Sequence, residues 1–466
     1  MHHTTVPTAC GHPLRTRTRT RTIVGALASL LFACAAPRSA PTPAPAPVTP
    51  PVASHPEPPS SPTASSDSVG RRDSTARPAD SAAIRSRAPV SVAPRATSPT
   101  ARVARARGPL RASTRTDTID VRALRAPLRV CSGGDVTLGT NLDTAWSRVA
   151  TQKLRTQFQR ADDPTTLLAP LRPLVGDAEL VLLNVESAIG AGPTATKCGP
   201  RSTNCFAFRA PPASASALRA LHGGGVVIGN IANNHARDAG SAGRDSTIAA
   251  LRRAGVLVTG ADSVATAVPT RGGDTIGVLG FYTSDSTPDA RDTAAVRRLV
   301  ARAAERYPVV IVTMHLGAEG PGAQRTRDAP ERYLGIDRGN PVAFADAAVR
   351  GGAALIVGHG PHVLRAVEWR ERGALIAYSL GNLLTYGPFR SREPLNRGAV
   401  LCTTIDTTGR VRSAELRSTV QLTPGVLERD ASRRALTLID SLGRLDFPGT
   451  SATIERSGRL RAAAGS

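Results

Sequence analysis

Lysine and aromatic residues are scarce in this chain. Only two lysines occur, Lys153 and Lys197, so arginine carries nearly all of the positive charge, and Phe, Trp and Tyr make up 3% of the residues. Because hydrophobic residues reach 41%, Ala, Val and Leu must supply most of the core. Proteins that bind single-stranded nucleic acid stack bases on aromatic side chains placed among their basic groups. We therefore expect no nucleic-acid partner, although the formal net charge is +23.

Two common catalytic motifs are missing as well. The chain has no G-x-S-x-G nucleophile elbow, which excludes a serine hydrolase of the α/β-hydrolase type. It also has no G-x-x-x-x-G-K-[ST] loop, which excludes a P-loop nucleotide-binding protein.

The N-terminus has the pattern of an export signal. A basic stretch, RTRTRTRT (residues 15–22), precedes the apolar stretch IVGALASLLFA (residues 23–33). This apolar stretch is shorter than the roughly 20 residues that a membrane-spanning helix needs. It ends in LFAC, which resembles the lipobox of bacterial lipoproteins and predicts a signal peptide over residues 1–34 with lipidation at Cys34. A plain secretory signal is the alternative.

Both interpretations place the rest of the protein outside the cytoplasm. We expect an exported lipoprotein of the cell envelope, anchored to a membrane by its N-terminal lipid at the outer membrane or the extracytoplasmic face. Residues 35–125 are rich in Pro, Ala, Ser and Arg and lack apolar periodicity, so they predict a disordered tether.

Residues 126–425 have the pattern of an α/β domain. Apolar runs of strand length, such as ELVLLN and PVVIVTMH, alternate with amphipathic helical stretches such as SAGRDSTIAALRRAG. Such continuous Val/Ile/Leu strands indicate a sheet that is buried on both faces. After residue 358 strand follows strand, which predicts a second, antiparallel section packed on the first. Residues 426–466 are expected to form a C-terminal helix, at residues 427–445, followed by a frayed tail.

Several apolar runs end in side chains that can bind a metal. The runs VLLNVE, VVIGNIANNH, VVIVTMH and LIVGHGPH each end in this way, and LRVCSGGD ends in an aspartate. Because ligands collect at the carboxyl ends of strands in open α/β sheets, we expect these side chains to share one edge of one sheet. The candidate metal ligands are Asp135, Glu186, Asn234, His235, His315, His359 and His362.

Mixed oxygen and imidazole ligands suit Mn, Fe or Zn better than Mg. We therefore expect one or two divalent ions, which could activate water for attack on a phosphoester. Each residue has a structural interpretation when it is taken alone: Asn233 can occupy a left-handed turn, and Glu319 can pair with a surface arginine. The coincidence of four such strand ends favours the metal site.

The cysteines allow two interpretations in each case. Cys198 and Cys205 lie in one polar loop, where an oxidising compartment favours a disulfide over a zinc knuckle. Cys131 and Cys402 lie in two strand-like runs and either pair across neighbouring strands or stay buried as free thiols.

Six motifs in order resemble the CapA family of poly-γ-glutamate capsule synthesis proteins. They are GD (residues 134–135), NVE (184–186), ANNHARDAG (232–240), HLGAE (315–319), GHGPHVLRAVE (358–368) and YSLGNLL (378–384), and the resemblance covers residues 128–404. It implies a four-layer αββα sandwich related to calcineurin-like metallophosphoesterases, with a metal centre on its rim.

The resemblance also implies roles for the residues at that rim. Six of the seven candidate ligands above, all but His359, carry over by motif, and Glu319 and Asp238 become carboxylate partners of the ligating histidines. Asn233 shapes the turn, and Asn382 closes the rim near the histidines. Thr137 stands where the phosphoesterase pattern has a histidine, which leaves open whether one or two ions bind. Gly360 stands where family members often have a histidine, with His359 one step earlier, which leaves open whether His359 or His362 binds metal.

Two functions follow as hypotheses. The first is a metal-dependent hydrolase that acts on a phosphoester or on an amide of a cell-surface polymer, with His315, His362 and Asp238 as the catalytic groups. The second is a non-catalytic surface protein that binds and helps assemble or export an anionic polymer such as poly-γ-glutamate.

Overall fold

The computed structural model describes residues 123–141, 144–190, 198, 205–284, 288–387, 389 and 392–462. The predicted signal peptide, Cys34 and nearly all of the predicted tether lie outside these residues. All described residues belong to the second of two units of the chain, Pro109–Ser466.

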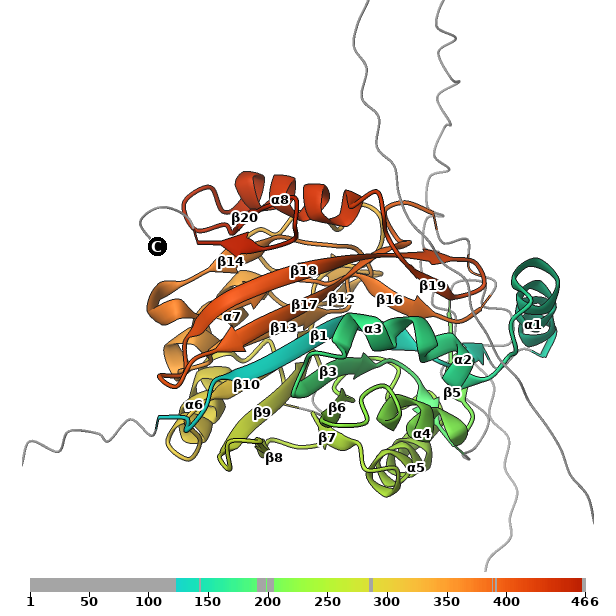
Figure 1. Cartoon of the computed structure of the whole chain (residues 1–466), viewed down its shortest axis with the longest axis horizontal. Helices are drawn as coiled ribbons and strands as arrows, with labels where there is room; N and C mark the ends of the chain where they lie inside the picture. The colour runs from blue at the N-terminus through green and yellow to red at the C-terminus, as the bar shows by residue number, and fades with distance from the viewer. Residues whose placement is uncertain are drawn as a thin grey trace, which may run out of the picture. The chain divides into compact units, whose positions relative to one another are not determined.

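The first of the two main β-sheets has the strand order β19-β18-β17-β1-β3-β6-β7 (Figure 1). Its parallel strands are β1 (Leu128–Thr137), β3 (Leu180–Val185), β6 (Val226–Asn230) and β7 (Leu257–Thr259). Three antiparallel strands extend it beyond β1: β17 (Arg397–Ile405), β18 (Val411–Leu422) and β19 (Val426–Arg429). Strand β16 (Asn382–Thr385) also pairs with β1, in parallel.

The second sheet has the order β14-β15-β13-β10-β9-β8. Its strands are β8 (Thr266–Pro269), β9 (Thr275–Tyr282), β10 (Val310–His315), β13 (Leu355–His359), β14 (Val367–Trp369) and β15 (Leu375–Ala377). The sequence predicts that the late strands form a separate antiparallel section. In the structure they extend the two sheets instead. They can do so because β17 pairs with β1 across a long sequence separation, which local patterns do not reveal.

Helices cover the outer faces of the two sheets. Three hydrophobic clusters separate the layers, and strand β3 shows how they form: Val181 and Leu183 join the first cluster, whereas Leu180 and Leu182 join the second. Since successive side chains of a strand point to opposite faces, β3 is buried on both sides. The third cluster lies between the second sheet and the helices α6 and α7. The αββα sandwich expected from the sequence is confirmed.

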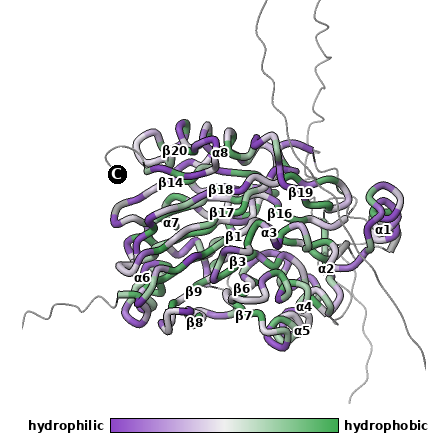
Figure 2. Tube along the Cα trace, viewed as in Figure 1, coloured by the Kyte–Doolittle hydropathy of each residue, from purple (hydrophilic) through white to green (hydrophobic). Residues whose placement is uncertain are grey.

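The outer helices next to the first sheet are α1 (Thr144–Phe158), α2 (Pro164–Leu168), α3 (Arg172–Val175), α4 (Ala213–Arg219) and α5 (Gly240–Arg253), with a 3-10 turn, η1 (Ala169–Leu171), between α2 and α3. Those next to the second sheet are α6 (Thr293–Ala304) and α7 (Pro341–Gly351). Figure 2 shows strongly hydrophilic segments along α1, α5 and α6, as expected of helices that turn one face to solvent. No helix in the described part of the chain is long and apolar enough to cross a membrane.

Local sequence sets the ends of α7. Asn340 caps its first turn by accepting hydrogen bonds from the backbone N–H groups of Val342 and Ala343, and Pro341 occupies the first helical position, where no donor is needed. Gly352 ends the helix in the left-handed region, with φ 103°. Local sequence therefore fixes both ends of this helix.

The C-terminal segment packs along one edge of both sheets. Helix α8 (Arg434–Asp446) contributes Leu436 and Ile439 to the cluster between the sheets, and Leu442 to the cluster of the second sheet. The helix expected at residues 427–445 thus starts later, because the residues before it form β19. A short hairpin of β20 (Thr453–Ile454) and β21 (Leu460–Arg461) follows, where the sequence predicts a frayed tail.

Candidate metal centre

The candidate site lies where the carboxyl ends of strands from both sheets meet. Asp135 lies near the end of β1 and Glu186 directly after β3, whereas His315 and His359 end β10 and β13 of the other sheet. The Gly360 N–H donates to Asp135 Oδ2 at 3.4 Å and so joins the two rims. The prediction that one edge of one sheet carries these residues is wrong, because the sandwich brings two such edges together.

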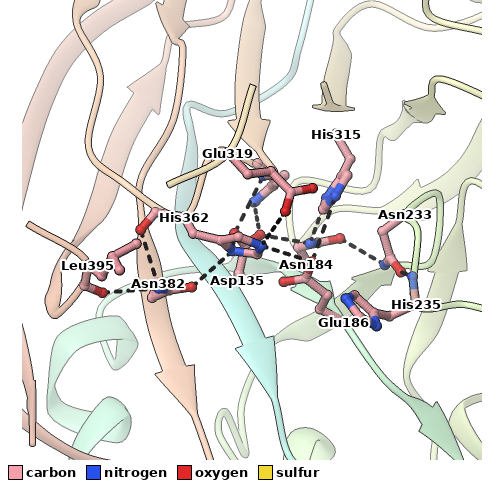
Figure 3. Close-up of polar contacts among 12 residues, drawn as sticks. Asp135, Asn184, Glu186, Asn233, His235, His315, Glu319, His362, Asn382 and Leu395 are labelled. Atoms are coloured by element: carbon pink, nitrogen blue, oxygen red, sulfur yellow. Dashed lines mark hydrogen bonds and ion pairs between the residues drawn. The ribbon is translucent and has the colours of Figure 1, made fainter. Parts of the chain in front are cut away.

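Asp135, Glu186 and His362 form the centre of the site (Figure 3). Each offers one ligand atom, and these three atoms lie within 4.8 Å of one another. The two carboxylates are buried, whereas the His362 side chain is 23% exposed. Although burial favours a neutral carboxyl, the rings of His359 and His362 hold the pKa of Asp135 well below its ordinary value.

Glu186 supplies the clearest sign that a cation fits here. Neither of its carboxylate oxygens has a hydrogen-bond partner among the described residues, although the residue is 1% exposed. A buried carboxyl group without partners is costly. Burial and the neighbouring Asp135 carboxylate raise the pKa of Glu186 well above its ordinary value. A divalent ion between Asp135, Glu186 and His362 would supply the missing partner.

His362 has the geometry of a metal ligand. Its backbone is left-handed, with φ 59°, and its Nδ1 lies 3.1 Å from both Asp135 Oδ2 and Asn382 Oδ1. Asn382 uses its Nδ2 to donate to the His362 and Leu395 carbonyls, so its Oδ1 must accept, and Nδ1 of His362 carries the proton. Nε2 then faces Glu186 Oε1 at 3.9 Å. Burial opposes the charged ring, but Glu186, Asp135 and Glu319 outweigh it and raise the pKa of His362 to about 10.

His359 lies on the other side of Asp135. Its Nδ1 is 3.6 Å from Asp135 Oδ1, and neither ring nitrogen has a hydrogen-bond partner among the described residues. Both histidines of the GHGPH motif therefore contact the same carboxylate. Only His362 belongs to the group of three whose ligand atoms converge.

A chain of amides fixes the proton of His315. Asn230 and Asn233 use their own Oδ1 atoms as acceptors for backbone N–H groups, so their Nδ2 groups donate to Asn184 Oδ1, at 3.0 and 3.1 Å. The Nδ2 of Asn184 then faces Asp135 Oδ1 at 2.8 Å and His315 Nδ1 at 3.2 Å. His315 Nδ1 must accept this bond.

The ring proton of His315 therefore lies on Nε2. Burial lowers the pKa of His315 well below its ordinary value, so the ring is neutral. Its Nε2 lies 3.7 Å from Glu186 Oε1. In this orientation His315 offers the site a hydrogen-bond donor, and metal binding through Nε2 would require that proton to leave.

The loop after β6 holds four further predicted residues. His235 Nδ1 lies 2.6 Å from Asp238 Oδ2, which also accepts a 2.7 Å bond from the Phe208 N–H. The ring of Phe208 packs on that of His235, with centroids 4.6 Å apart. Asn234 lies half-buried in the same loop, and Figure 3 places His235 at the end of the cluster away from Asn382. Asp238 thus fixes the orientation of His235.

Glu319 extends the site through a loop held by buried arginines. Its Oε2 lies 3.7 Å from His362 Nε2, and its Oε1 lies 2.8 Å from Arg338 Nη2. The same loop is tied down by Arg365, which is fully buried and binds both carboxylate oxygens of Glu331 at 2.8 and 2.7 Å.

Sequence reasoning missed four of these residues: Asn184, Asn230, Arg338 and Arg365. The two asparagines could have been found as amides inside the apolar runs VLLNV and VVIGN. The two arginines gave no such signal in a chain so rich in arginine.

Both pairs of cysteines form disulfides in the structure. Cys198 is bonded to Cys205 within one loop. Cys131 is bonded to Cys402, which lies opposite it in the antiparallel pairing of β1 and β17. The second bond decides between the two alternatives that the sequence leaves open.

Comparison with known proteins gives the family. The model of the family "Bacterial capsule synthesis protein PGA_cap" matches residues 129–386, more than half of the chain. The "PGA biosynthesis protein CapA" of Bacillus subtilis (strain 168) is 30% identical over 171 residues, which cover 33% of this chain and 41% of that protein. The "Capsule biosynthesis protein CapA" of Bacillus anthracis is 27% identical over 186 residues, or 36% and 42% of the two chains.

The chain thus matches about two fifths of the length of each of these relatives. Among solved structures, a 5'-nucleotidase precursor from Thermus thermophilus aligns with a TM-score of 0.34 and 12% identity, over 69% of this chain and 59% of that one. The family model and the two relatives agree, and the chain belongs to the bacterial capsule synthesis protein family PGA_cap, as its resemblance to CapA proteins implies.

Proposed function

We propose that this protein is a metal-dependent hydrolase of the phosphoesterase type that acts in the synthesis of a poly-γ-glutamate capsule. The single observation that carries the proposal is the Glu186 carboxylate, which is buried between Asp135 and His362 with no hydrogen-bond partner among the described residues. A site for structural hydrogen bonding would satisfy such a group. A site built to bind a cation leaves the carboxylate without hydrogen-bond donors, so that it can bind the ion.

The residues that would hold the metal are Asp135, Glu186 and His362. With its proton on Nδ1, His362 presents an unprotonated Nε2 once its second proton has left, and Asp135 and Asn382 fix the ring. Oxygen and imidazole donors together favour Mn, Fe or Zn. When bound, the ion would act as a Lewis acid that polarises a phosphoryl or carbonyl oxygen and activates water.

Two further side chains are placed to move or share protons. His235 is held through Nδ1 by the buried Asp238, an arrangement that fixes the orientation of the ring. The His315 Nε2–H is a fixed donor that can bind an oxygen on which negative charge develops. We assign proton transfer to His235 with Asp238, and stabilisation of charge to His315.

We also propose that the protein works outside the cytoplasm. The basic and apolar stretches at residues 15–33 and the cysteine at position 34 support export and a lipid anchor in the cell envelope. The two disulfides support the same location, because disulfides persist in oxidising compartments.

Hydrolysis with and without metal tests the proposed activity. The full-length chain is dialysed against a chelator, reloaded with Mn, Fe or Zn, and assayed on p-nitrophenyl phosphate and on a γ-glutamyl amide. We expect turnover that appears on reloading and falls at least a hundredfold in Glu186→Gln. The exposed Glu305→Gln should act as wild type.

Two results would speak against this proposal. Turnover that persists in the chelated protein, or that survives Glu186→Gln, would place the reaction elsewhere. A protein that binds poly-γ-glutamate equally well with and without metal, and hydrolyses neither substrate, would favour the non-catalytic polymer-binding function.

A further inference from the structure

Arg338 places a buried guanidinium beside the candidate metal centre. It directly follows β12 (Ile336–Asp337), and its side chain is 4% exposed. The Arg338 N–H donates to the Glu331 carbonyl, and the Arg338 carbonyl accepts from the Gly317 N–H, both at 2.8 Å. The loop between β10 and α7 therefore holds this residue in place.

Ring contacts direct Arg338 toward the centre. Its Cζ lies 5.7 Å from the centroid of the Tyr282 ring, a cation–π distance. The Tyr282 ring meets the edge of the His315 ring, with centroids 5.5 Å apart. The guanidinium is thus one side chain away from the His315 donor.

Part of the binding capacity of this guanidinium is unused. Its Nη2 contacts Glu319 Oε1 at 2.8 Å, but Nε has no hydrogen-bond partner among the residues that the structure describes. A guanidinium has five donors in a rigid fork that matches carboxylate and phosphoryl oxygens in pairs. A buried arginine with an unpaired Nε beside a metal centre is therefore built to take a further oxyanion.

Glu319 occupies the place where such an oxyanion would lie. One of its oxygens contacts Arg338, and the other lies 3.7 Å from His362 Nε2. The Glu319 side chain is 12% exposed and that of His362 is 23% exposed, so solvent reaches the centre from this side.

We infer that Arg338 binds an oxyanion group of the substrate, a phosphoryl or carboxylate oxygen, and that Glu319 holds this position when no substrate is bound. The inference rests on the proposed function, because it names the charge of the substrate beside the reacting bond. Glu319 and the substrate compete for the same guanidinium. Removing the Glu319 charge therefore favours the oxyanion, and removing Arg338 disfavours it.

Anion binding by calorimetry tests this competition. Inorganic phosphate and glutarate are titrated into the full-length chain, manganese-loaded and metal-free, for the wild type, Arg338→Met, Arg338→Lys and Glu319→Gln. We expect Arg338→Met to weaken binding about tenfold or more, since hydrogen bonds to charged groups are lost. Arg338→Lys should recover part of this loss, and Glu319→Gln should tighten binding several-fold. The exposed Arg297→Met is the matched control and should change nothing.

The two probes and the metal content separate the outcomes. If the wild type binds phosphate more tightly than glutarate, the group that Arg338 binds is a phosphoryl group. If it binds glutarate more tightly, that group is a carboxylate. Retained metal with equal anion affinity in the wild type and Arg338→Met overturns this inference and leaves the metal centre standing.

Absence of metal in the wild type refutes the proposed function instead. In that case, the anion affinities of metal-free wild type and Arg338→Met still show whether Arg338 binds the anion. Failure of the wild type to bind either anion also overturns the inference. If Arg338→Met does not fold, Glu319→Gln decides, because unchanged affinity in that variant contradicts the competition.

Discussion

The protons of two histidines distinguish their roles at the centre. Asn184 donates to His315 Nδ1, whereas Asn382 accepts from His362 Nδ1. His315 therefore offers N–H at Nε2, and His362 offers Nε2 as a ligand. Roles that look alike in the sequence differ because the neighbouring amides are oriented in opposite directions.

Nitrogen-15 NMR of the metal-free protein tests these assignments. We expect His315 to show a protonated Nε2 and an unprotonated Nδ1 at neutral pH. Asn184→Leu should remove this preference, since the amide that imposes it is gone. A wild-type spectrum in which His315 is protonated on Nδ1 would contradict the amide chain.

Metal binding should release protons. Since the pKa of His362 is raised to about 10, its ring holds a second proton at neutral pH, and the metal must displace that proton. The raised pKa of Glu186 acts in the same direction. The apparent metal affinity should therefore rise about tenfold per pH unit for each proton released, from about pH 6 to 9. Titration calorimetry in buffers of different ionisation enthalpy measures that proton count, and a count of zero would contradict it.

At the scale of elements, a buried ion pair holds the loop that carries Glu319 and Arg338. Arg365 follows β13 and binds Glu331 through two hydrogen bonds, and its Nε donates to the Ala323 carbonyl at 2.7 Å. Local sequence could not reveal this pair, because its partners lie on separate segments and the chain has many arginines. The strand ends could be predicted, because apolar runs such as VVIVTMH stop at a polar residue.

Arg365→Met should destabilise the fold strongly. It leaves the Glu331 carboxylate half-buried without its partner, and removing one member of a buried pair costs about 3–5 kcal/mol. Urea unfolding measures this loss. In Arg412→Met, whose arginine is 63% exposed and pairs with Asp406, the loss should stay below about 1 kcal/mol. Equal losses in the two variants would show that the Arg365 pair does not hold the loop.

At the scale of the whole molecule, a disulfide joins β1, the first strand of the first sheet along the chain, to β17, one of its last. The Cys131–Cys402 bond closes a loop with a sequence separation of 271, whereas Cys198–Cys205 spans 7. The sequence could predict the layers, through the resemblance to the CapA family, and the succession of strands and helices along the chain. It could not predict that β17 lies next to β1, because that pairing depends on contacts far apart in the chain.

Removing the longer disulfide should cost more stability than removing the shorter one. A disulfide constrains the unfolded chain more when it closes a longer loop, and its loss typically costs about 2–5 kcal/mol. We expect Cys131→Ala/Cys402→Ala to lie at the upper end and Cys198→Ala/Cys205→Ala at the lower end. Thermal and urea unfolding compare them, and the reverse order would contradict this expectation.

The metal content of the purified full-length chain tests the central claim most directly. Elemental analysis of the wild type should find one or two Mn, Fe or Zn ions per chain. The double variant Glu186→Gln/His362→Ala should contain none while its circular dichroism stays unchanged. A folded wild-type protein that contains no metal and takes up none on addition, or a double variant that retains its metal, would contradict the assignment of this rim as a metal centre.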